Sequence, residues 1–336
     1  MVLALDDKWV WDSWYVRDGD RWHGFFLQAD KSLGDPELRH WNVSIGHATS
    51  LDLSNWTYLG TCFQPSVGPA WDDKTTWTGS VVQDDDGLWH LFYTGTSSAE
   101  DGLLQRIGHA VSDDLHRWRR VGDGLALDRT SEAYEEYQKG LWPDRAFRDP
   151  WVMRDPDGPG WLMVFTARMS GIEDRLEAGA IGFASSPDLY SWKLEDPLFA
   201  GSFGQLEVPQ IFTLEGRWYC LFCTGADCWS RSTIDRAGPA LTGSHYLIGD
   251  GPRGPWRLAP GPMFDGADPT DRYAARIVVD GGEPKLLGFR WFDRSGAKFI
   301  GEIADPVCVE IDKSGRLLRS DQEVEPRGGR SWPASG

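Results

Sequence analysis

Short apolar and aromatic runs recur along the chain, and a polar turn precedes each of them. They read WHGFFLQ from Trp22, WHLFYTG from Trp89, WLMVFTA from Trp161, WYCLFCTG from Trp218 and, less clearly, KLLGFRW from Lys285. Aromatic and β-branched runs of this length favour strands, and turns such as QDDDG and LEGR are typical of hairpins. Their spacing of roughly 55 to 75 residues indicates one repeated unit.

A second pattern follows the runs and completes the unit. It reads GHATSLDLSNW from Gly46, GHAVSDDLHRW from Gly108 and GFASSPDLYSW from Gly182, with degenerate copies from His245 and near Phe299. Each unit therefore holds a first strand, a hairpin, a second and third strand, and a turn carrying D-L-x-x-W, which is the make-up of a four-stranded blade. The sequence predicts an all-β fold: a five-bladed β-propeller that forms a single domain over residues 1–325, without a C-terminal β-sandwich. Residues 326–336 are expected to form a C-terminal tail.

The repeat separates structural residues from candidates for chemistry. A residue that recurs from blade to blade is expected to serve the fold. The aspartate of the D-L-x-x-W turn is expected to cap backbone N–H groups, and the tryptophan to pack between blades. The expected turn caps are Asp52, Asp114 and Asp188, and the expected inter-blade residues are Trp56, Trp118 and Trp192.

The beginnings of the five first strands carry the candidate chemistry. Ten to twelve residues before the aromatic runs stand Asp12, Thr78, Asp149, Glu207 and Tyr273, which the alignment places at one repeated position. First strands of propeller blades line the central channel, so these side chains are expected to meet at one rim. Carboxyl groups that lie close together raise one another's pKa, and a carboxylate beside a carboxylic acid is what glycoside cleavage requires. We predict that Asp12, Asp149 and Glu207 are catalytic; a calcium-binding ring and turn capping are the alternatives.

The neighbours of these acids suit a sugar. Tryptophan rings can stack on a sugar ring, an arginine can hold two hydroxyl groups at once, and an amide can bind hydroxyl groups. The predicted substrate-binding residues are Trp11, Gln28, Trp77, Thr78, Arg148 and Tyr273.

Composition and charge narrow the class of partner. The formal net charge of −17 disfavours nucleic acid, because an acidic surface repels phosphate. No stretch is apolar enough to span a membrane and the first residues lack the features of a signal peptide, so a cytoplasmic location is expected. Cys220 and Cys223 form a C-x-x-C within a strand, which directs them to opposite faces, so neither a metal site nor a cofactor is expected. A small carbohydrate is the expected partner, and the oligomeric state stays open.

Taken in order, these segments resemble the motifs of glycoside hydrolase families 32 and 68, the fructan-active propeller enzymes. WVWDSW is similar to the nucleophile segment of the levansucrases of family 68. HGFFLQ, GHATS, WTGS, FRDP, LEVPQIF and DRYAARIV are similar to segments of the invertases and fructanases of family 32. The similarity covers almost the whole chain, and six motifs in the right order are far more specific than any one of them.

The resemblance implies a role for each candidate. Asp12 would be the nucleophile of a retaining mechanism, and Glu207 its acid/base. Asp149, with Arg148 beside it, would stabilise the transition state, and Thr78 would hydrogen-bond the nucleophile. The implied residues of the first sugar subsite are Gln28, Trp11 and Trp77. The implied substrates are β-fructofuranosides, sucrose or short fructo-oligosaccharides, with hydrolysis and fructosyl transfer both open.

Departures from the family 32 pattern keep other functions open. Trp11 stands where that family has an asparagine before the nucleophile, Gln210 replaces the second acid of its E-C-P-D segment, and the chain has no room for its β-sandwich. One alternative is a family 43-like arabinofuranosidase or xylosidase, which would invert configuration; the R-D-P and W-x-G-S segments disfavour it. The other is a non-catalytic sugar-binding propeller, which the presence of all three acids disfavours.

Overall fold

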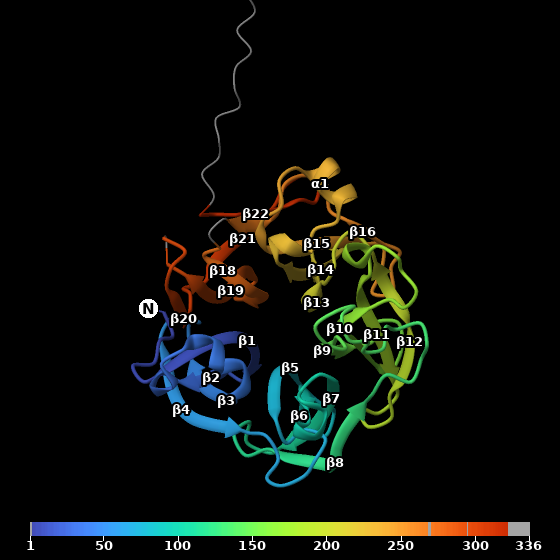
Figure 1. Ribbon diagram of the computed structural model, residues 1–336. Coiled ribbons are helices and arrows are strands. Elements are labelled where there is room, and N and C mark those ends of the chain that lie inside the picture. The colour runs from blue at the N-terminus through green and yellow to red at the C-terminus, as the bar shows by residue number, and fades with distance from the viewer. Residues whose placement is uncertain (1, 268–269, 294, 322–336) are drawn as a thin grey trace, which may run out of the picture.

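The computed structural model describes residues 2–267, 270–293 and 295–321, which form five antiparallel sheets in a ring around a central axis (Figure 1). The first strand of each sheet lies nearest the axis, and the later strands follow outward in chain order. The predicted five-bladed β-propeller is therefore confirmed, and every sheet of the described residues belongs to the ring. The predicted tail, residues 326–336, lies outside the described residues.

The first four blades follow the repeat closely. Blade 1 contains β1 (Lys8–Asp18), β2 (Arg21–Asp30), β3 (Ser44–Ser50) and β4 (Trp56–Phe63). Blade 2 contains β5 (Thr75–Gln83), β6 (Trp89–Thr96), β7 (Arg106–Ser112) and β8 (Arg119–Leu127). Blade 3 contains β9 (Phe147–Arg154), β10 (Trp161–Arg168), β11 (Gly179–Ser186) and β12 (Lys193–Ala200). Blade 4 contains β13 (Glu207–Leu214), β14 (Arg217–Thr224), β15 (Thr242–Gly249), β16 (Trp256–Leu258) and β17 (Asp265–Ala267), the last also paired with β15.

Blade 5 is irregular, as its weak repeat suggests. It begins with β18 (Arg272–Asp280) and β19 (Glu283–Phe292). Two short strands, β20 (Phe299–Ile303) and β21 (Val307–Ile311), then both pair with β19, and β22 (Leu317–Arg319) pairs with β21. The ring closes beside β20, where Leu3 and Ile303 exchange two backbone hydrogen bonds of 3.1 and 3.0 Å. The start of the chain thus ties blade 1 to blade 5.

The D-L-x-x-W turns are capped as predicted. The aspartate carboxylate accepts two backbone N–H groups, at 2.9 and 2.7 Å in Asp52, 2.9 and 2.8 Å in Asp114, and 2.9 and 2.7 Å in Asp188. The leucine after each aspartate has a φ between 62° and 70°, in the left-handed region that costs a non-glycine residue free energy. Each of these leucines is buried, so packing and the cap together hold the turn.

The tryptophans of these turns pack against the preceding blade. Trp118 meets the ring of Phe25 in blade 1 edge-on at 5.9 Å, and Trp192 meets Phe92 in blade 2 edge-on at 5.4 Å. Trp56 packs on a cluster that includes Leu287 of blade 5. The predicted inter-blade role is confirmed, because the same residue bridges to the previous blade in each case.

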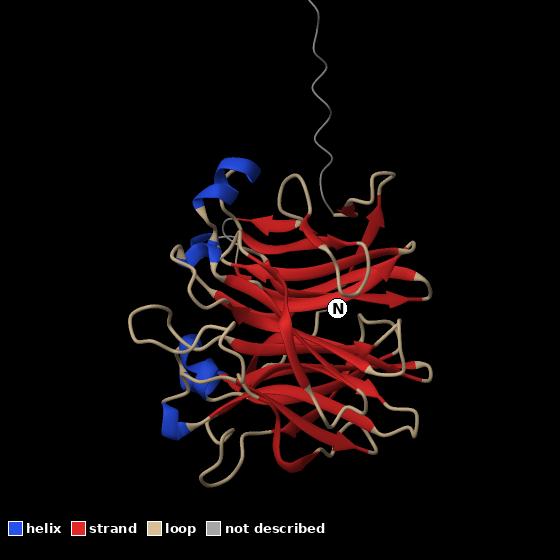
Figure 2. Cartoon of the chain, turned by 90° about the vertical axis from the view of Figure 1, so that its right-hand side faces the viewer, coloured by secondary structure: helices blue, strands red, loops and turns tan. Residues whose placement is uncertain are grey.

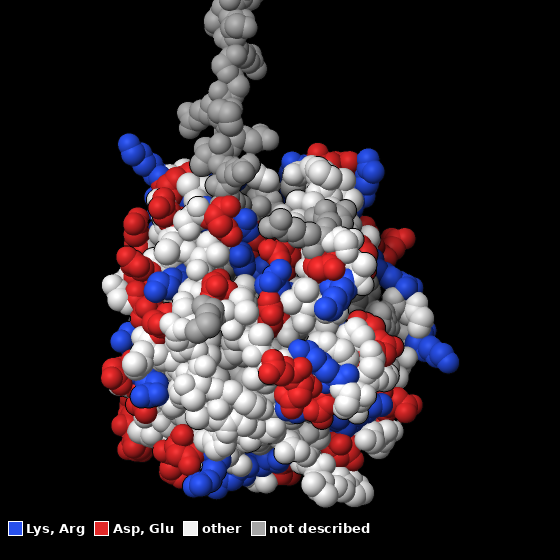
Figure 3. Space-filling view, turned by 90° about the vertical axis from the view of Figure 1, so that its left-hand side faces the viewer, with Lys and Arg blue, Asp and Glu red and all other residues white. Residues whose placement is uncertain are grey.

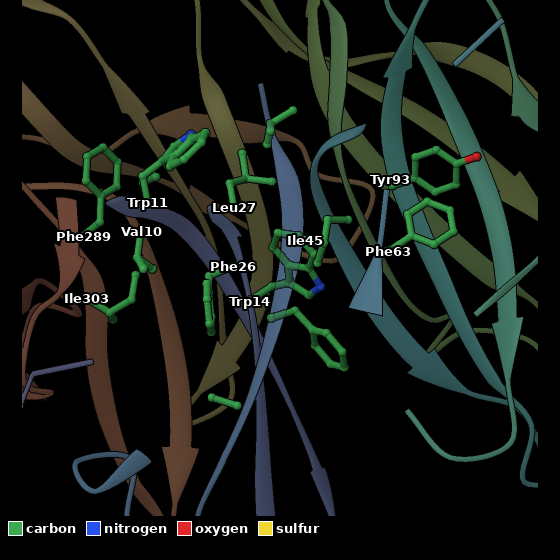
Figure 4. Close-up of a cluster of buried hydrophobic side chains, with 14 of the residues drawn as sticks. Val10, Trp11, Trp14, Phe26, Leu27, Ile45, Phe63, Tyr93, Phe289 and Ile303 are labelled. Atoms are coloured by element: carbon green, nitrogen blue, oxygen red, sulfur yellow. The ribbon is translucent and has the colours of Figure 1, made fainter. Parts of the chain in front are cut away.

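The core runs between the blades rather than through one centre. Figure 4 shows Val10 of blade 1 beside Ile303 of blade 5. On the other side of blade 1, the ring of Phe63 lies 4.8 Å from that of Tyr93 in blade 2. Burial of these apolar surfaces joins neighbouring blades, so that no blade can bury its own faces alone.

Short helical segments gather at one end of the propeller axis (Figure 2). They all lie in the connections between the second and third strands of blades 1 to 4. They are η1 (Lys31–Leu33), η2 (Pro36–Trp41), η3 (Ser98–Glu100), η4 (Arg175–Glu177), η5 (Ala226–Cys228) and α1 (Arg231–Ala237). The first strands begin at this same end, because each second strand runs back antiparallel to the first. Among the described residues, no helix is long and apolar enough to cross a membrane.

The outer surface carries both signs of charge. On the face shown in Figure 3, acidic and basic side chains are interspersed rather than gathered into a basic patch. The chain as a whole has an excess of acidic residues, 51 against 34 basic ones.

Replacing a turn cap should lower stability without changing the site. Asp114→Ala removes the acceptor of two backbone N–H groups and is expected to reduce the free energy of unfolding by about 1 kcal/mol. Asp113→Ala is the matched control, because the adjacent Asp113 is exposed and makes one ion pair, at 3.6 Å, to an exposed Arg119. Urea unfolding of both variants tests this, and an equal loss in the two would contradict the capping role.

Candidate active site

A cavity of about 420 Å³ opens at the end of the axis where the helical segments lie. The first strands of all five blades contribute to its lining, together with residues of η2 and η5. The structure brings eight of the nine predicted site residues to it: Trp11, Asp12, Trp77, Thr78, Arg148, Asp149, Glu207 and Tyr273. Side chains separated by more than 250 residues in sequence therefore share one cavity.

A β-bulge in every first strand shapes the cavity wall. In blade 1, Trp11 pairs with Leu27 but Ser13 pairs with Phe26, which leaves Asp12 as an extra residue. The other four first strands break register with the second strand at the same level. Such a bulge bends the strand and turns a side chain away from the regular alternation. The extra residue has a positive φ in four of the blades: 22° for Asp12, 59° for Asp149, 52° for Val208 and 47° for Ala274.

The strand pairing corrects part of the sequence alignment. The residues just before the bulges all face the same position of the second strand: Trp11, Trp77, Arg148, Glu207 and Tyr273. The bulge residues themselves are Asp12, Thr78, Asp149, Val208 and Ala274. The prediction that Glu207 and Tyr273 share the position of Asp12 is therefore wrong by one residue. The prediction counted back ten to twelve residues from each aromatic run, and a window of that width cannot resolve a shift of one residue.

Asp12 sits in a desolvated position with a hydroxyl donor. The Thr78 hydroxyl donates a hydrogen bond to Asp12 Oδ2. Burial, followed by the nearby Asp149 carboxylate, raises the pKa of Asp12 to about 7, although the Thr78 hydrogen bond opposes the shift. The carboxyl group therefore changes charge near neutral pH.

Glu207 is held at both oxygens. Arg148 Nη2 donates to Oε1 at 2.7 Å, and the Tyr273 hydroxyl donates to Oε2 at 2.5 Å. Burial and the neighbouring Cys223 and Glu207 raise the pKa of Tyr273 well above its ordinary value, so the phenol keeps its proton. The carboxyl group is thereby fixed in orientation by one charged and one neutral donor.

Asp149 shares the cavity with the other two acids and is tied to the backbone. Its Oδ2 accepts hydrogen bonds from the Thr166 hydroxyl at 2.8 Å and from the backbone N–H of Val208 at 3.2 Å. Its own N–H donates to Thr94 Oγ1 at 2.8 Å. Burial raises the pKa of Asp149, and the adjacent Arg148 opposes that shift.

Gln28 does not reach the cavity, contrary to the expectation that it binds substrate. Its side chain is fully buried inside blade 1. The amide donates to Thr61 Oγ1 at 2.8 Å and to Ser44 Oγ at 3.3 Å, and it accepts from the Tyr58 hydroxyl at 2.9 Å. Its neighbour Leu27 lines the cavity instead, because successive residues of a strand point to opposite faces.

Several residues that line the cavity belong to no recognisable motif, so the sequence did not predict them. Gln105 accepts a hydrogen bond of 3.1 Å from Arg148 and donates one of 2.8 Å to Asp144. The others lie in connections that differ from blade to blade, so the repeat gives no signal for them: Glu37, Arg39, His40, Gln205 and Asp227. Among the described residues, no group of three or more His, Cys, Asp or Glu is placed to hold a metal ion.

A propeller with three carboxyl groups at one end of its axis has the groups that a glycoside hydrolase needs, and comparison with known proteins identifies the family. The profile described as "Glycosyl hydrolases family 32 N-terminal domain" matches residues 14–298. The chain therefore belongs to glycosyl hydrolase family 32. The prediction of a glycoside hydrolase of the fructofuranoside-acting families 32 and 68 is confirmed.

Individual relatives extend this similarity along the chain. The "Extracellular sucrase" of Zymomonas mobilis is 26% identical over 94% of this chain and 82% of its own length. The "Sucrose-6-phosphate hydrolase" of Bacillus subtilis is 32% identical, over 51% of this chain and 33% of its own length. Among solved structures, an inulosucrase from Halalkalicoccus jeotgali bound to kestose has a TM-score of 0.75 at 23% identity, covering 96% of this chain and 92% of that one. The Bacillus subtilis levansucrase has a TM-score of 0.74 at 18% identity, covering 96% and 88%; these two likenesses show the shared fold.

The melting temperature of Asp12→Asn, relative to that of the wild type, is expected to be a few degrees higher at pH 8 than at pH 5. The folded chain raises the pKa of this carboxyl to about 7, from about 4 in the unfolded chain. Its contribution to stability is complete below the unfolded pKa and is lost as the pH rises through 7, whereas asparagine does not titrate. Melting temperatures at both pH values test this, and an equal difference at both would contradict it.

Asp188→Asn is the matched control for that measurement. Hydrogen bonds from the backbone N–H groups of Ser191 and Tyr190 lower the pKa of Asp188. Its carboxyl is therefore ionised in the folded and unfolded chain at both pH values, and the difference from the wild type should be the same at pH 5 and pH 8.

Proposed function

We propose that the chain is a retaining β-fructofuranosidase that cleaves sucrose or short fructo-oligosaccharides through a covalent fructosyl intermediate. The observation that carries this proposal is the contrast between two carboxyl groups of one cavity. Asp12 is desolvated beside a single hydroxyl donor, whereas Glu207 is held between a guanidinium and a phenol. Retention needs two carboxyl groups in one cavity, because one attacks as a carboxylate and the other transfers the proton.

Each group has a step in this mechanism. Ionised Asp12 attacks the anomeric carbon, and Glu207 gives its proton to the leaving glycosidic oxygen. Glu207 then takes a proton from water, whose oxygen displaces Asp12 and releases the sugar. A sugar hydroxyl in place of water gives fructosyl transfer. Asp149, fixed by Thr166 and by the backbone of Val208, binds the hydroxyl groups of the furanose.

Membership of family 32 and the similarity to a sucrase support fructose as the sugar. The cavity of about 420 Å³ suits a small carbohydrate, and Trp11, Trp77 and Trp291 supply flat surfaces on its wall. The cytoplasmic location stays a prediction, and the Zymomonas relative is named as extracellular.

The charge of the cavity favours a neutral substrate over a sugar phosphate. Six carboxyl groups line it: Asp12, Glu37, Asp144, Asp149, Glu207 and Asp227. Two guanidinium groups, Arg39 and Arg148, oppose them, and burial lowers the pKa of His40 to about 4, so that it is neutral. Burial raises the pKa of three of the acids, Asp12, Asp144 and Asp149. Six carboxyl groups against two guanidinium groups make the lining of the cavity acidic.

A substrate panel tests the reaction and the substrate class together. Sucrose should release fructose with retained anomeric configuration, read by NMR of the first product. Sucrose 6-phosphate should be cleaved with a kcat/KM lower by about tenfold or more, because a like charge opposes binding. Release of arabinose from nitrophenyl arabinofuranoside, with no fructose from sucrose, would instead support a family 43-like activity. No release from any furanoside would support a binding propeller.

Two variants test the proposed roles of Asp12 as nucleophile and Glu207 as acid/base. Asp12→Asn should lower kcat on sucrose by about 10⁴-fold or more, the scale at which removing a central catalytic group acts. Glu207→Gln should lower it by about 10²- to 10⁴-fold but spare the cleavage of β-fructosyl fluoride, whose leaving group needs no proton. Asp52→Asn, in a distant turn, is the control for handling and folding. Wild-type turnover of sucrose in both site variants would overturn the assignment.

A further inference from the structure

A buried cation lies beneath the cavity floor. Arg276 belongs to β18, two residues beyond the bulge of blade 5, and its side chain is 1% exposed. Among the described residues, its Nε and Nη2 have no hydrogen-bond partner. Its guanidinium lies 5.1 Å from the ring centroid of Trp151 in blade 3. Burying a guanidinium with unpaired N–H groups costs free energy, so a functional role is the natural explanation for a buried arginine here.

Arg276 holds the backbone that positions two of the acids. Its Nη1 donates to the carbonyl oxygens of Val208 at 3.1 Å and Pro209 at 2.7 Å. Val208 is β-branched and has a φ of 52°, a strained conformation for such a residue. This residue follows Glu207 directly, and its N–H donates to Asp149. Arg276 thus holds the carbonyl groups of Val208 and Pro209, while the N–H group of Val208 holds Asp149.

The other blades provide an internal control. At the equivalent position, Ser80 Oγ accepts from Val152 N–H at 3.1 Å, and Trp151 donates to Ile211 O at 3.2 Å. Gln210 of blade 4 exchanges two hydrogen bonds of 2.7 Å with the backbone of Ile277. Neutral side chains therefore join neighbouring blades at this level, so the fold by itself does not require a charge there.

We propose that Arg276 is a positioning residue for the reaction: its hydrogen bonds hold the Val208–Pro209 bulge, and its charge favours the carboxylate forms of Asp12 and Asp149. This inference deepens the proposed function and rests on it for its kinetic consequences. Arg276 is not among the residues that line the cavity, so it acts through the acids above it.

The electrostatics of the site agree with this role. Burial lowers the pKa of Arg276 to about 10, so the group remains charged at neutral pH, and Arg276 in turn lowers the pKa of Asp12. The titratable groups that face it from the surrounding strands are Asp12 and Tyr15 of β1, Asp149 of β9, and Cys220 and Cys223 of β14. Burial raises the pKa of Tyr15 and of both thiols, so these groups are neutral. Asp12 and Asp149 are therefore the acidic groups that interact with the charge of Arg276.

Two substitutions separate the charge from the hydrogen bonds. Arg276→Gln keeps an N–H donor for the two carbonyl oxygens but removes the cation, and Arg276→Lys keeps the cation. The acid limb of the kcat/KM profile on sucrose should move up by about one pH unit in Arg276→Gln, because a lost cation makes carboxyl groups harder to ionise. It should stay near the wild-type position in Arg276→Lys.

Gln210→Met is the matched control, since it removes the neutral inter-blade contact of the same layer. It should lower the melting temperature and leave the acid limb in place. An acid limb that is the same in Arg276→Gln, Gln210→Met and the wild type would overturn the proposal and leave Arg276 a structural residue.

A readout without substrate keeps this test apart from that of the proposed function. Loss of the cation raises the pKa of the buried acids in the folded chain, so the melting temperature of Arg276→Gln should fall further below that of the wild type at pH 8 than at pH 5. A wild type inactive on every furanoside would refute the proposed function, while this pH dependence would still decide whether Arg276 acts on the acids. An equal deficit at both pH values would count against it.

Discussion

In every blade the first strand carries one residue more than the strand beside it, and this mismatch governs where the reactive side chains point. A regular strand would alternate its residues between the two faces of a blade and send every second one into the core between blades. The bulge interrupts that alternation at the rim. Two adjacent residues, such as Arg148 and Asp149, can therefore both line the cavity.

The bulges have an energetic cost that the rest of the site offsets. Val208 and Asp149 adopt positive φ values, which non-glycine residues rarely do. The Thr94 and Thr166 hydroxyls accept from the backbone N–H groups of Asp149 and Val208, and Arg276 donates to the Val208 carbonyl, which ties these segments to neighbouring strands and blades. Strain of this kind persists only where the surrounding structure overdetermines it, and a rigid ring of blades provides that surrounding.

Charge is the second constraint on the site, because three acids meet in a place with little water. The structure gives each of them a different environment: a hydroxyl for Asp12, a guanidinium and a phenol for Glu207, and a hydroxyl with a backbone amide for Asp149. Groups of one chemical type can then hold different protonation states at one pH, which is the basis of acid–base division in a glycosidase. Arg148 and the buried Arg276 supply the positive charge that such a cluster needs.

The sequence alone was enough for the blade count, the turn caps and the inter-blade tryptophans, because these depend on local patterns that repeat. It also brought Asp12, Asp149 and Glu207 to one rim, since the first strands of a propeller must share the axis. Only the tertiary structure decided the register at that rim, because a bulge adds one residue to the first strand without changing the hydrophobic pattern. Gln28 turns into blade 1 because successive residues of a strand point to opposite faces, and the sequence does not show which of Leu27 and Gln28 faces the cavity. Arg39 and Gln105 reach the cavity from connections that follow no repeat, and Arg276 meets Val208 only across two blades. Such contacts exist only when distant segments pack together, so no local pattern in the chain can encode them.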